Sequence, residues 1–280
     1  MTKDFPLVIF TLLQQMAAGG FILLAILLIR QQLNQTSSLQ LSRRLIVILI
    51  LSGLALASST LHLGHPLRGA NVLFGLGRSW LSNEVFITGT FFGSVGFYWL
   101  VSWKKQEWLG LRKLSLIVGL LSGLAGLAAM SLTYMIATVP VWNSWHTPAG
   151  FFATAATTGA LLALLLLQPI EDFYTPKIQA GIHFVGLTGL FACALVMGMQ
   201  DAHWAGISTA ITTPAEQFSG YSGWMTARVI LLLAAAILWL TVLLKDCITS
   251  SALFAILFLV LAAEATGRVI YYSVHLTVGL

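Results

Sequence analysis

Charged residues are scarce in this chain of 280 residues. Asp, Glu, Lys and Arg together account for 8% of it, while hydrophobic residues account for 58%. A soluble domain has about a quarter charged residues, so this composition excludes a soluble globular protein. The mean hydropathy of +0.90 indicates that most of the chain lies in a lipid bilayer. The apolar residues run in long blocks rather than in short alternating segments, which predicts transmembrane helices and excludes a β-barrel.

Cysteine is almost absent as well. Cys193 and Cys247 lie far apart and form neither a CxxC nor a CxxCH pattern. This excludes an iron–sulfur cluster or a covalently attached c-type haem built from this chain alone. The net charge of +5 does not indicate nucleic-acid binding, because the basic residues flank apolar blocks, where they mark membrane orientation.

A helix needs about 20 apolar residues to cross the hydrocarbon core. The sequence predicts an all-α polytopic membrane protein, with residues 1–280 forming one bundle and no soluble domain. The eight predicted transmembrane helices are Phe5–Ile29, Leu45–Leu63, Glu84–Val101, Leu114–Ala137, Pro148–Leu167, Lys177–Met199, Trp224–Leu244 and Ser251–Ser273.

The distribution of lysine and arginine predicts the orientation, because short cytoplasmic loops collect these residues. Nine of the 14 fall at the first, third, fifth and seventh connections, and Arg228 and Arg268 fall inside predicted helices. Both termini are therefore expected outside, which in a bacterium is the periplasm. The nine are Arg30, Arg43, Arg44, Lys104, Lys105, Arg112, Lys113, Lys177 and Lys245.

Two further patterns concern packing and partners. The longest connections, about His65–Asn83 and Gln200–Gly223, lie on the predicted outer side. We expect them to form short surface helices that can dock a partner. Two pairs of glycines at four-residue spacing are expected to let helices approach closely; they are Gly89 with Gly93 and Gly119 with Gly123.

Ionisable residues at membrane depth are costly and call for a reason. His62 ends the second predicted helix and Glu84 opens the third, so both lie at the same depth. An imidazole and a carboxylate at this depth can accept the two hydroxyl protons of a quinol during its oxidation. The alternative is structural: His62 caps a helix, and Glu84 lies at the positive end of the next helix dipole.

The last predicted helix carries a second group of candidates. Glu264 and Arg268 are four residues apart on one helix face, and His275 follows near the outer end. An ion pair within the helix explains the two charges. Alternatively, Glu264 is a relay carboxylate and His275 a second quinol contact. Other polar residues within the spans, namely Gln14, Gln15, His183 and Arg228, are expected to form hydrogen bonds between helices.

Three stretches of this sequence resemble the membrane anchor subunit of the dimethyl sulfoxide reductase family. The first is His62-Leu63-Gly64 with Pro66, Arg68 and Asn71, followed by Leu81-Ser82-Asn83-Glu84. The others are Thr138-Val139-Pro140-Val141-Trp142 and the run from Gly267 to Gly279. With matches from Pro6-Leu7 onward, the resemblance covers nearly the whole sequence.

This resemblance implies an eight-helix anchor in the bacterial inner membrane with no haem or iron–sulfur cluster of its own. It implies that the anchor binds and oxidises menaquinol near the periplasmic face and passes electrons to an iron–sulfur subunit, which is joined by a molybdopterin catalytic subunit. By position in the motif, His62, Gly64, Arg68 and Glu84 match the family's quinol-site residues. Glu264, Arg268 and His275 are further candidates for that site.

Three other interpretations remain open from the residues alone. A haem b anchor needs facing axial histidines, and His62 with His275 is the only plausible outer pair. A secondary transporter would use Glu264 and Arg268 as its coupling pair, although the sequence shows neither internal repeats nor interrupted helices. A purely structural anchor would bind no quinol. The terminal electron acceptor is not encoded in this sequence.

Overall fold

A computed structural model describes residues 5–61, 66–170, 175–209 and 212–277. Within these ranges all regular structure is helical, without any strand. Eight segments are long and apolar enough to cross a membrane. The expected all-α, eight-helix fold is confirmed.

Each long helix coincides with an apolar block of the sequence, because within a bilayer the backbone must pair with itself. The elements are α1 (Phe5–Ile29), α2 (Gln35–Arg44), α3 (Ile46–Leu61), η1 (Pro66–Gly75), α4 (Trp80–Lys104), α5 (Leu109–Thr133), α6 (His146–Leu167), α7 (Pro176–Ala205), α8 (Pro214–Gln217), α9 (Tyr221–Leu244) and α10 (Ser250–Ser273). Helices α2 and α3 together form one candidate span, Gln35–Leu61. This span begins ten residues before the predicted Leu45 because Asn34 caps the polar α2 by accepting a hydrogen bond from Ser37 N.

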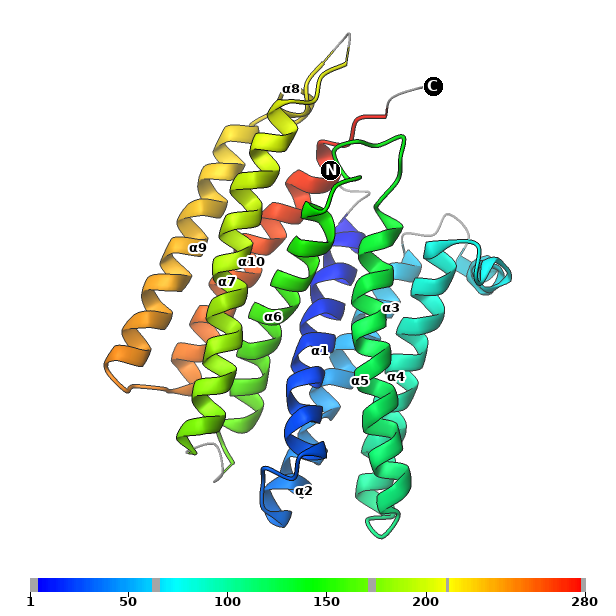
Figure 1. The fold of residues 1–280 in the computed structure, drawn as a ribbon, viewed down its shortest axis with the longest axis vertical. Helices are drawn as coiled ribbons and strands as arrows, with labels where there is room; N and C mark the ends of the chain where they lie inside the picture. The colour runs from blue at the N-terminus through cyan, green and yellow to red at the C-terminus, as the bar shows by residue number, and fades with distance from the viewer. Residues whose placement is uncertain (1–4, 62–65, 171–174, 210–211, 278–280) are drawn as a thin grey trace.

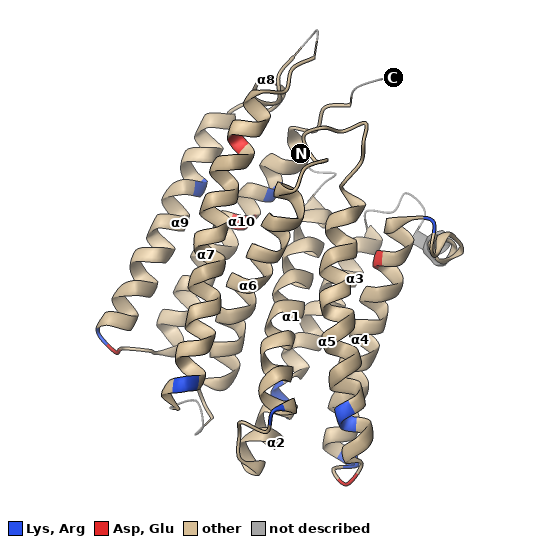
Figure 2. Ribbon diagram, in the orientation of Figure 1, with Lys and Arg blue, Asp and Glu red and all other residues tan. Residues whose placement is uncertain are grey.

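The helices run alternately up and down, so the start of α1 and the end of α10 lie at the same end of the bundle (Figure 1). We call this the upper end and the opposite one the lower end. Lysine and arginine gather at the lower end (Figure 2), as expected from the connections in which they fall. By the positive-inside rule, the lower end is predicted to face the cytoplasm.

The bundle has two halves joined along α1 and α6. Helices α1 to α5 pack mainly with one another, as do α6, α7, α9 and α10, and the contact between α1 and α6 is among the most extensive. That contact depends on Gly19 and Gly159, where an added Cβ would clash with the backbone of the facing helix. Neither glycine was singled out from the sequence.

The predicted glycine pairs have different outcomes. A Cβ on Gly119 would crowd the Phe21 ring and one on Gly123 the Phe91 ring, so close packing of α5 at these positions is confirmed. The prediction for Gly89 and Gly93 is wrong, since a Cβ on either would meet no atom of the described residues within 4 Å. A four-residue spacing places two glycines on one face, but it does not say whether that face meets a helix.

Both long connections at the upper end contain short helices, as expected. The first carries η1 and the second α8. Helix α8 begins with a capping box in which Thr213 and Glu216 bond each other's backbone N–H groups. These two elements lie at the end of the bundle where the candidate site residues are found.

Candidate functional site

Glu84 lies in the second turn of α4 and is buried, with 3% of its surface exposed. The Thr133 hydroxyl, at the last residue of α5, lies 2.7 Å from Glu84 Oε2. The same hydroxyl lies 2.9 Å from the carbonyl oxygen of Ala129. One turn deeper on the same face of α4, the buried Thr88 hydroxyl has no hydrogen-bond partner among the described residues. The α4–α5 interface therefore carries a polar strip that begins with a carboxylate.

The connection before α4 is fastened to the helix beside Glu84. Asn83 Oδ1 accepts a hydrogen bond of 2.9 Å from Gly77 N. Gly75 approaches Ser82 so closely that a Cβ would clash with the Ser82 hydroxyl. The residues immediately before Glu84 in the family-like motif thus hold η1 against α4.

The other residues of that motif are placed less completely. His62 and Gly64 lie outside the described residues, and α3 ends at Leu61, at the upper end where α4 begins. Arg68 belongs to η1, of which the backbone is described at this position. The grouping of these three residues with Glu84 stays a prediction.

An aromatic cluster fills the upper end between Glu84 and α10. It consists of Tyr134, Trp142, Phe151, Tyr271 and Tyr272, and the Tyr134 ring lies 5.4–5.9 Å from the other four. The Tyr272 and Tyr134 hydroxyls are 3.1 Å apart, and Trp142 Nε1 donates to the Tyr271 carbonyl at 2.8 Å. Two motifs that lie far apart in the sequence, 138–142 and 267–279, meet in this cluster.

His275 follows the end of α10 at the edge of the aromatic cluster. Its ring stacks on Trp142 with centroids 5.5 Å apart, and Nδ1 lies 3.3 Å from the Tyr272 carbonyl oxygen. The side chain is exposed. Glu264 lies about 16 Å along the helix from His275 at 1.5 Å per residue, so these two side chains are not in direct contact.

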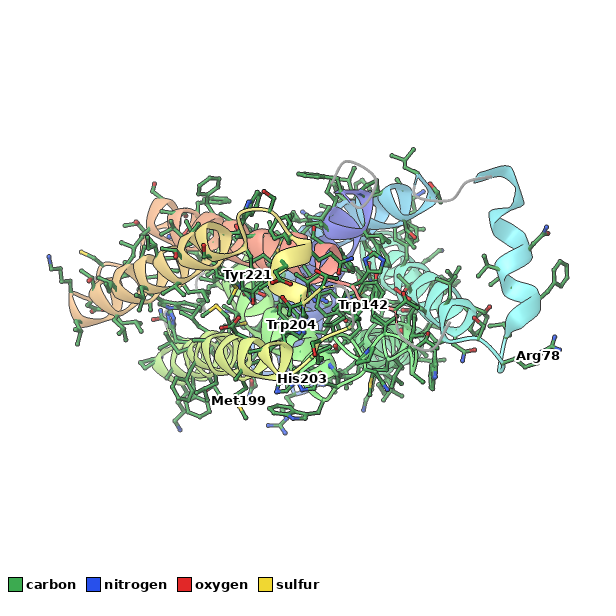
Figure 3. All side chains as sticks on the ribbon, turned by 90° about the horizontal axis from the view of Figure 1, so that it is seen from above. Arg78, Trp142, Met199, His203, Trp204 and Tyr221 are labelled. Atoms are coloured by element: carbon green, nitrogen blue, oxygen red, sulfur yellow. The ribbon has the colours of Figure 1, made fainter. Side chains whose placement is uncertain are left out.

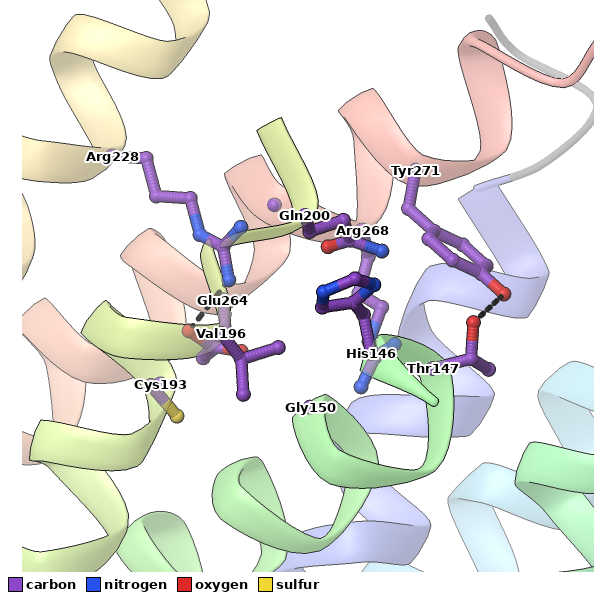
Figure 4. A pocket seen from close by; sticks show the side chains of 11 residues that line it. His146, Thr147, Gly150, Cys193, Val196, Gln200, Arg228, Glu264, Arg268 and Tyr271 are labelled. Carbon is purple, nitrogen blue, oxygen red and sulfur yellow. Dashed lines mark hydrogen bonds and ion pairs between the residues drawn. The ribbon is translucent and has the colours of Figure 1, made fainter. Parts of the chain in front are cut away.

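Glu264 forms a buried ion pair, but not with Arg268. Its Oε1 lies 3.2 Å from Arg228 Nη2 of α9, and its Oε2 accepts from the Thr154 hydroxyl of α6 at 2.7 Å. Arg268 instead donates to Gln15 Oε1 of α1 at 3.1 Å and lies 3.8 Å from the centre of the Phe151 ring. The predicted pair within one helix is therefore wrong, and these contacts join α1, α6, α9 and α10. Figure 4 shows the pairing of Arg228 with Glu264.

The expected hydrogen bonds between helices are confirmed for the remaining polar residues. Ser52 donates to Gln14 at 2.8 Å, and Trp239 Nε1 donates to His183 Nδ1 at 2.9 Å. Gln15 and Arg228 belong to the charge network just described. This network is connected to the aromatic cluster through the contact of Arg268 with Phe151.

A cavity of about 20 Å³ lies beside this charge network, lined also by His146, Gln200 and Tyr271. That volume holds about one water molecule, whereas pockets for small organic ligands enclose about 300 Å³ or more. The Nε groups of Arg228 and Arg268 are buried without a partner among the described residues. A water in this cavity can accept from them, but a quinol ring does not fit.

The upper surface divides into a central part and a projecting part. Viewed from above, Trp142 and Trp204 lie over the bundle, whereas Arg78 lies apart beside η1 (Figure 3). Trp204 Nε1 donates to the Val141 carbonyl at 2.9 Å, which fastens the end of α7 to the connection before α6.

Within the described ranges, His, Cys, Asp and Glu nowhere gather as a group of three or more that could hold a metal ion.

Sequence comparison places this protein among membrane subunits. Residues 1–274 match the family model described as DMSO reductase anchor subunit (DmsC). The sequence is 35% identical over 280 residues to the C subunit of the anaerobic dimethyl sulfoxide reductase of Escherichia coli (strain K12), with 99% of this protein and 96% of the relative covered. The anaerobic dimethyl sulfoxide reductase subunit YnfH of the same organism is 32% identical over 278 residues, with coverage of 99% and 96%. The C subunit of the Haemophilus influenzae reductase is 31% identical over 282 residues, again with 99% and 96%.

Proposed function

We propose, because this chain belongs to the family of DMSO reductase anchor subunits, that it holds a periplasmic molybdoenzyme on the bacterial inner membrane and oxidises menaquinol for it. Its partners are an iron–sulfur subunit, which receives the electrons, and a molybdopterin catalytic subunit. Eight membrane-spanning segments supply the anchor. The quinol reacts at the upper end, which faces the periplasm in this proposal.

The observation that carries this proposal is the buried carboxylate of Glu84 with its hydroxyl partner. Oxidation of a quinol to a quinone releases two protons and two electrons. Glu84 takes one hydroxyl proton and His62, which follows Leu61 in the sequence, takes the other, since a base must lie within hydrogen-bonding reach of the proton that it removes. Gly64 and Arg68 complete the site by their position in the shared motif.

Thr133 suits a carboxylate that changes its protonation state. When Glu84 is ionised, the Thr133 hydroxyl donates to Oε2 over 2.7 Å. When Glu84 carries a proton, the carboxyl group can donate to the threonine oxygen, and the threonine hydrogen can turn to the Ala129 carbonyl 2.9 Å away. A hydroxyl both donates and accepts, so Glu84 keeps a partner in either state.

The charge network of α10 has a structural role in this proposal. Glu264 already has an arginine and a threonine as partners, and Arg268 is shared between Gln15 and Phe151. The adjoining cavity is too small for the quinol ring. His275, exposed at the upper end, lies on the surface over which the partner docks.

The iron–sulfur subunit docks on the upper surface, where η1 projects from the bundle (Figure 3). Phe74 at the end of η1 is 79% exposed, and Leu73 beside it is 41% exposed. Exposed apolar side chains on a projecting element mark a contact surface. This surface adjoins the start of α4, so a cluster in the docked subunit would lie near Glu84.

The test is quinol-analogue binding and quinol oxidation in membranes that carry the assembled complex. We expect Glu84→Gln and His62→Ala to assemble normally and to lower the oxidation rate by about 10²-fold or more, the contribution of a positioned base. Thr133→Val should lower the rate of quinol oxidation by a smaller factor, because Glu84 loses its hydroxyl partner.

Thr90→Val is the matched control for Thr133→Val. Thr90 is also at a helix surface, but among the described residues its hydroxyl bonds only the Phe86 carbonyl within α4, at 2.9 Å. Its removal should leave quinol oxidation unchanged. Normal oxidation by fully assembled Glu84→Gln and His62→Ala complexes would contradict the proposed site and favour a purely structural anchor.

A further inference from the structure

A groove of about 450 Å³ opens at the lower end of the bundle. One wall comes from the end of α1 and the start of α2, and the other from the hairpin between α4 and α5. The backbone leaves α1 through Gln31, which has a positive φ of 52°, and α2 then packs against α4, with the Ser42 and Tyr98 hydroxyls 2.8 Å apart. The groove lies at the opposite end of the molecule from Glu84 and plays no part in the proposed quinol chemistry.

Two adjacent cations of α5, Arg112 and Lys113, line this groove. The described lining includes no acidic side chain. Arg112 is held in place by hydrogen bonds from Nε to Ser102 Oγ at 3.2 Å and from Nη1 to the Gln106 carbonyl at 3.3 Å. Among the described residues, neither its Nη2 group nor the Lys113 ammonium group has a hydrogen-bond or ion-pair partner. A fixed guanidinium with unused donors favours a phosphate oxygen.

The remainder of the lining is largely apolar. Leu28 and Ile29 of α1 face the groove from one side, and Leu109 and Leu116 of α5 line it from the other. A free phosphate ion would leave these side chains uncovered. An acyl chain would cover them, and polar side chains such as Gln35 at the mouth suit a headgroup.

We propose that this groove binds one anionic phospholipid, with its phosphodiester on Arg112 and Lys113 and an acyl chain along the leucine wall. The location supports this assignment, because basic pockets between transmembrane helices at the membrane surface bind acidic lipid headgroups. The bound lipid joins the α1–α2 connection to the α4–α5 hairpin. It therefore stabilises the lower end of the half of the bundle that carries Glu84.

The test is native mass spectrometry of the full-length protein, purified and delipidated in detergent, with phosphatidylglycerol or phosphatidylcholine of the same acyl chains. We expect one tightly bound phosphatidylglycerol and weaker binding of phosphatidylcholine. Each basic side chain near the net negative charge of anionic lipid contributes about 1 kcal/mol, which is about fivefold in affinity. The double variant Arg112→Gln/Lys113→Gln should therefore bind phosphatidylglycerol about 25-fold more weakly.

The matched control is Lys104→Gln/Lys105→Gln, which removes two adjacent charges from the same hairpin but outside the groove lining. It should bind phosphatidylglycerol like the wild type. Gln35→Glu adds a negative charge at the exposed mouth of the groove and should weaken binding even if the double variant does not fold. Equal losses in the control, equal affinity for both lipids, or displacement of the lipid by inorganic phosphate would each overturn the proposal.

Discussion

Glu264→Gln is the substitution that best separates a structural charge network from a proton relay. Arg228, Glu264 and Arg268 together carry a net charge of +1, and the neutral glutamine raises it to +2 in a buried region. Arg228 would also lose its ion-pair partner, 3.2 Å away. Removing one member of a buried ion pair costs about 3–5 kcal/mol, so we expect the free energy of unfolding to fall by about that amount.

A double variant works as the internal control for this prediction. Arg228→Met/Glu264→Met returns the net charge to +1 and leaves no charge of this network without a partner. Thr154 keeps its hydrogen bond to the Gly150 carbonyl at 2.8 Å, and Arg268 keeps Gln15. Because an apolar pair often replaces a buried ion pair at little cost, the double variant should unfold within about 2 kcal/mol of the wild type.

The assay is equilibrium unfolding of the purified protein in mixed micelles, followed by far-UV circular dichroism. Quinol turnover per assembled complex is measured in parallel. We expect Glu264→Gln to lose stability while the complexes that do assemble keep their turnover. If Glu264→Gln unfolds like the wild type but loses turnover, and the double variant loses it equally, Glu264 is a relay carboxylate and the structural interpretation is refuted.

Three further predictions concern packing and orientation. Gly159→Ala should destabilise the protein by about 1–3 kcal/mol or more, because its Cβ would clash with the backbone at Gly19. Gly93→Ala should be tolerated, because its Cβ meets no atom of the described residues within 4 Å. Thermal unfolding of the two variants checks this. Trp239→Phe should cost about 1–3 kcal/mol, since it removes the hydrogen bond to His183, and unchanged stability would contradict that role. Alkaline phosphatase fused to the C-terminus should be active if the upper end faces the periplasm, and an inactive fusion with an active cytoplasmic reporter would reverse the orientation.

Several features of the fold were predictable because they depend on local sequence. Each apolar block is long enough to span the bilayer by itself, so all eight spans could be found without knowing their neighbours. The connections at the upper end could likewise be expected to contain short helices. The predicted start of the second span was wrong, because α2 is a polar segment and hydrophobic length does not reveal it. This segment is helical and is capped by Asn34.

The candidate site was predictable only in part. Glu84 could be singled out because a carboxylate at membrane depth is rare. Its partner Thr133 is 49 residues away. A threonine at the end of a predicted helix does not by itself indicate a hydrogen bond to a carboxylate on another helix. The fastening of η1 by Asn83 depends equally on a contact between separate elements.

The sequence by itself determined that this is an eight-helix membrane protein with basic residues at one end, because hydrophobic length and charge position act locally. Only the tertiary structure decided which polar groups meet. The spacing of Glu264 and Arg268 allows a pair within one helix, yet Arg228 from α9 bonds Glu264 and Arg268 turns to α1. Spacing along one helix fixes which side chains share a face, whereas the packing of the other helices determines which residues contact that face.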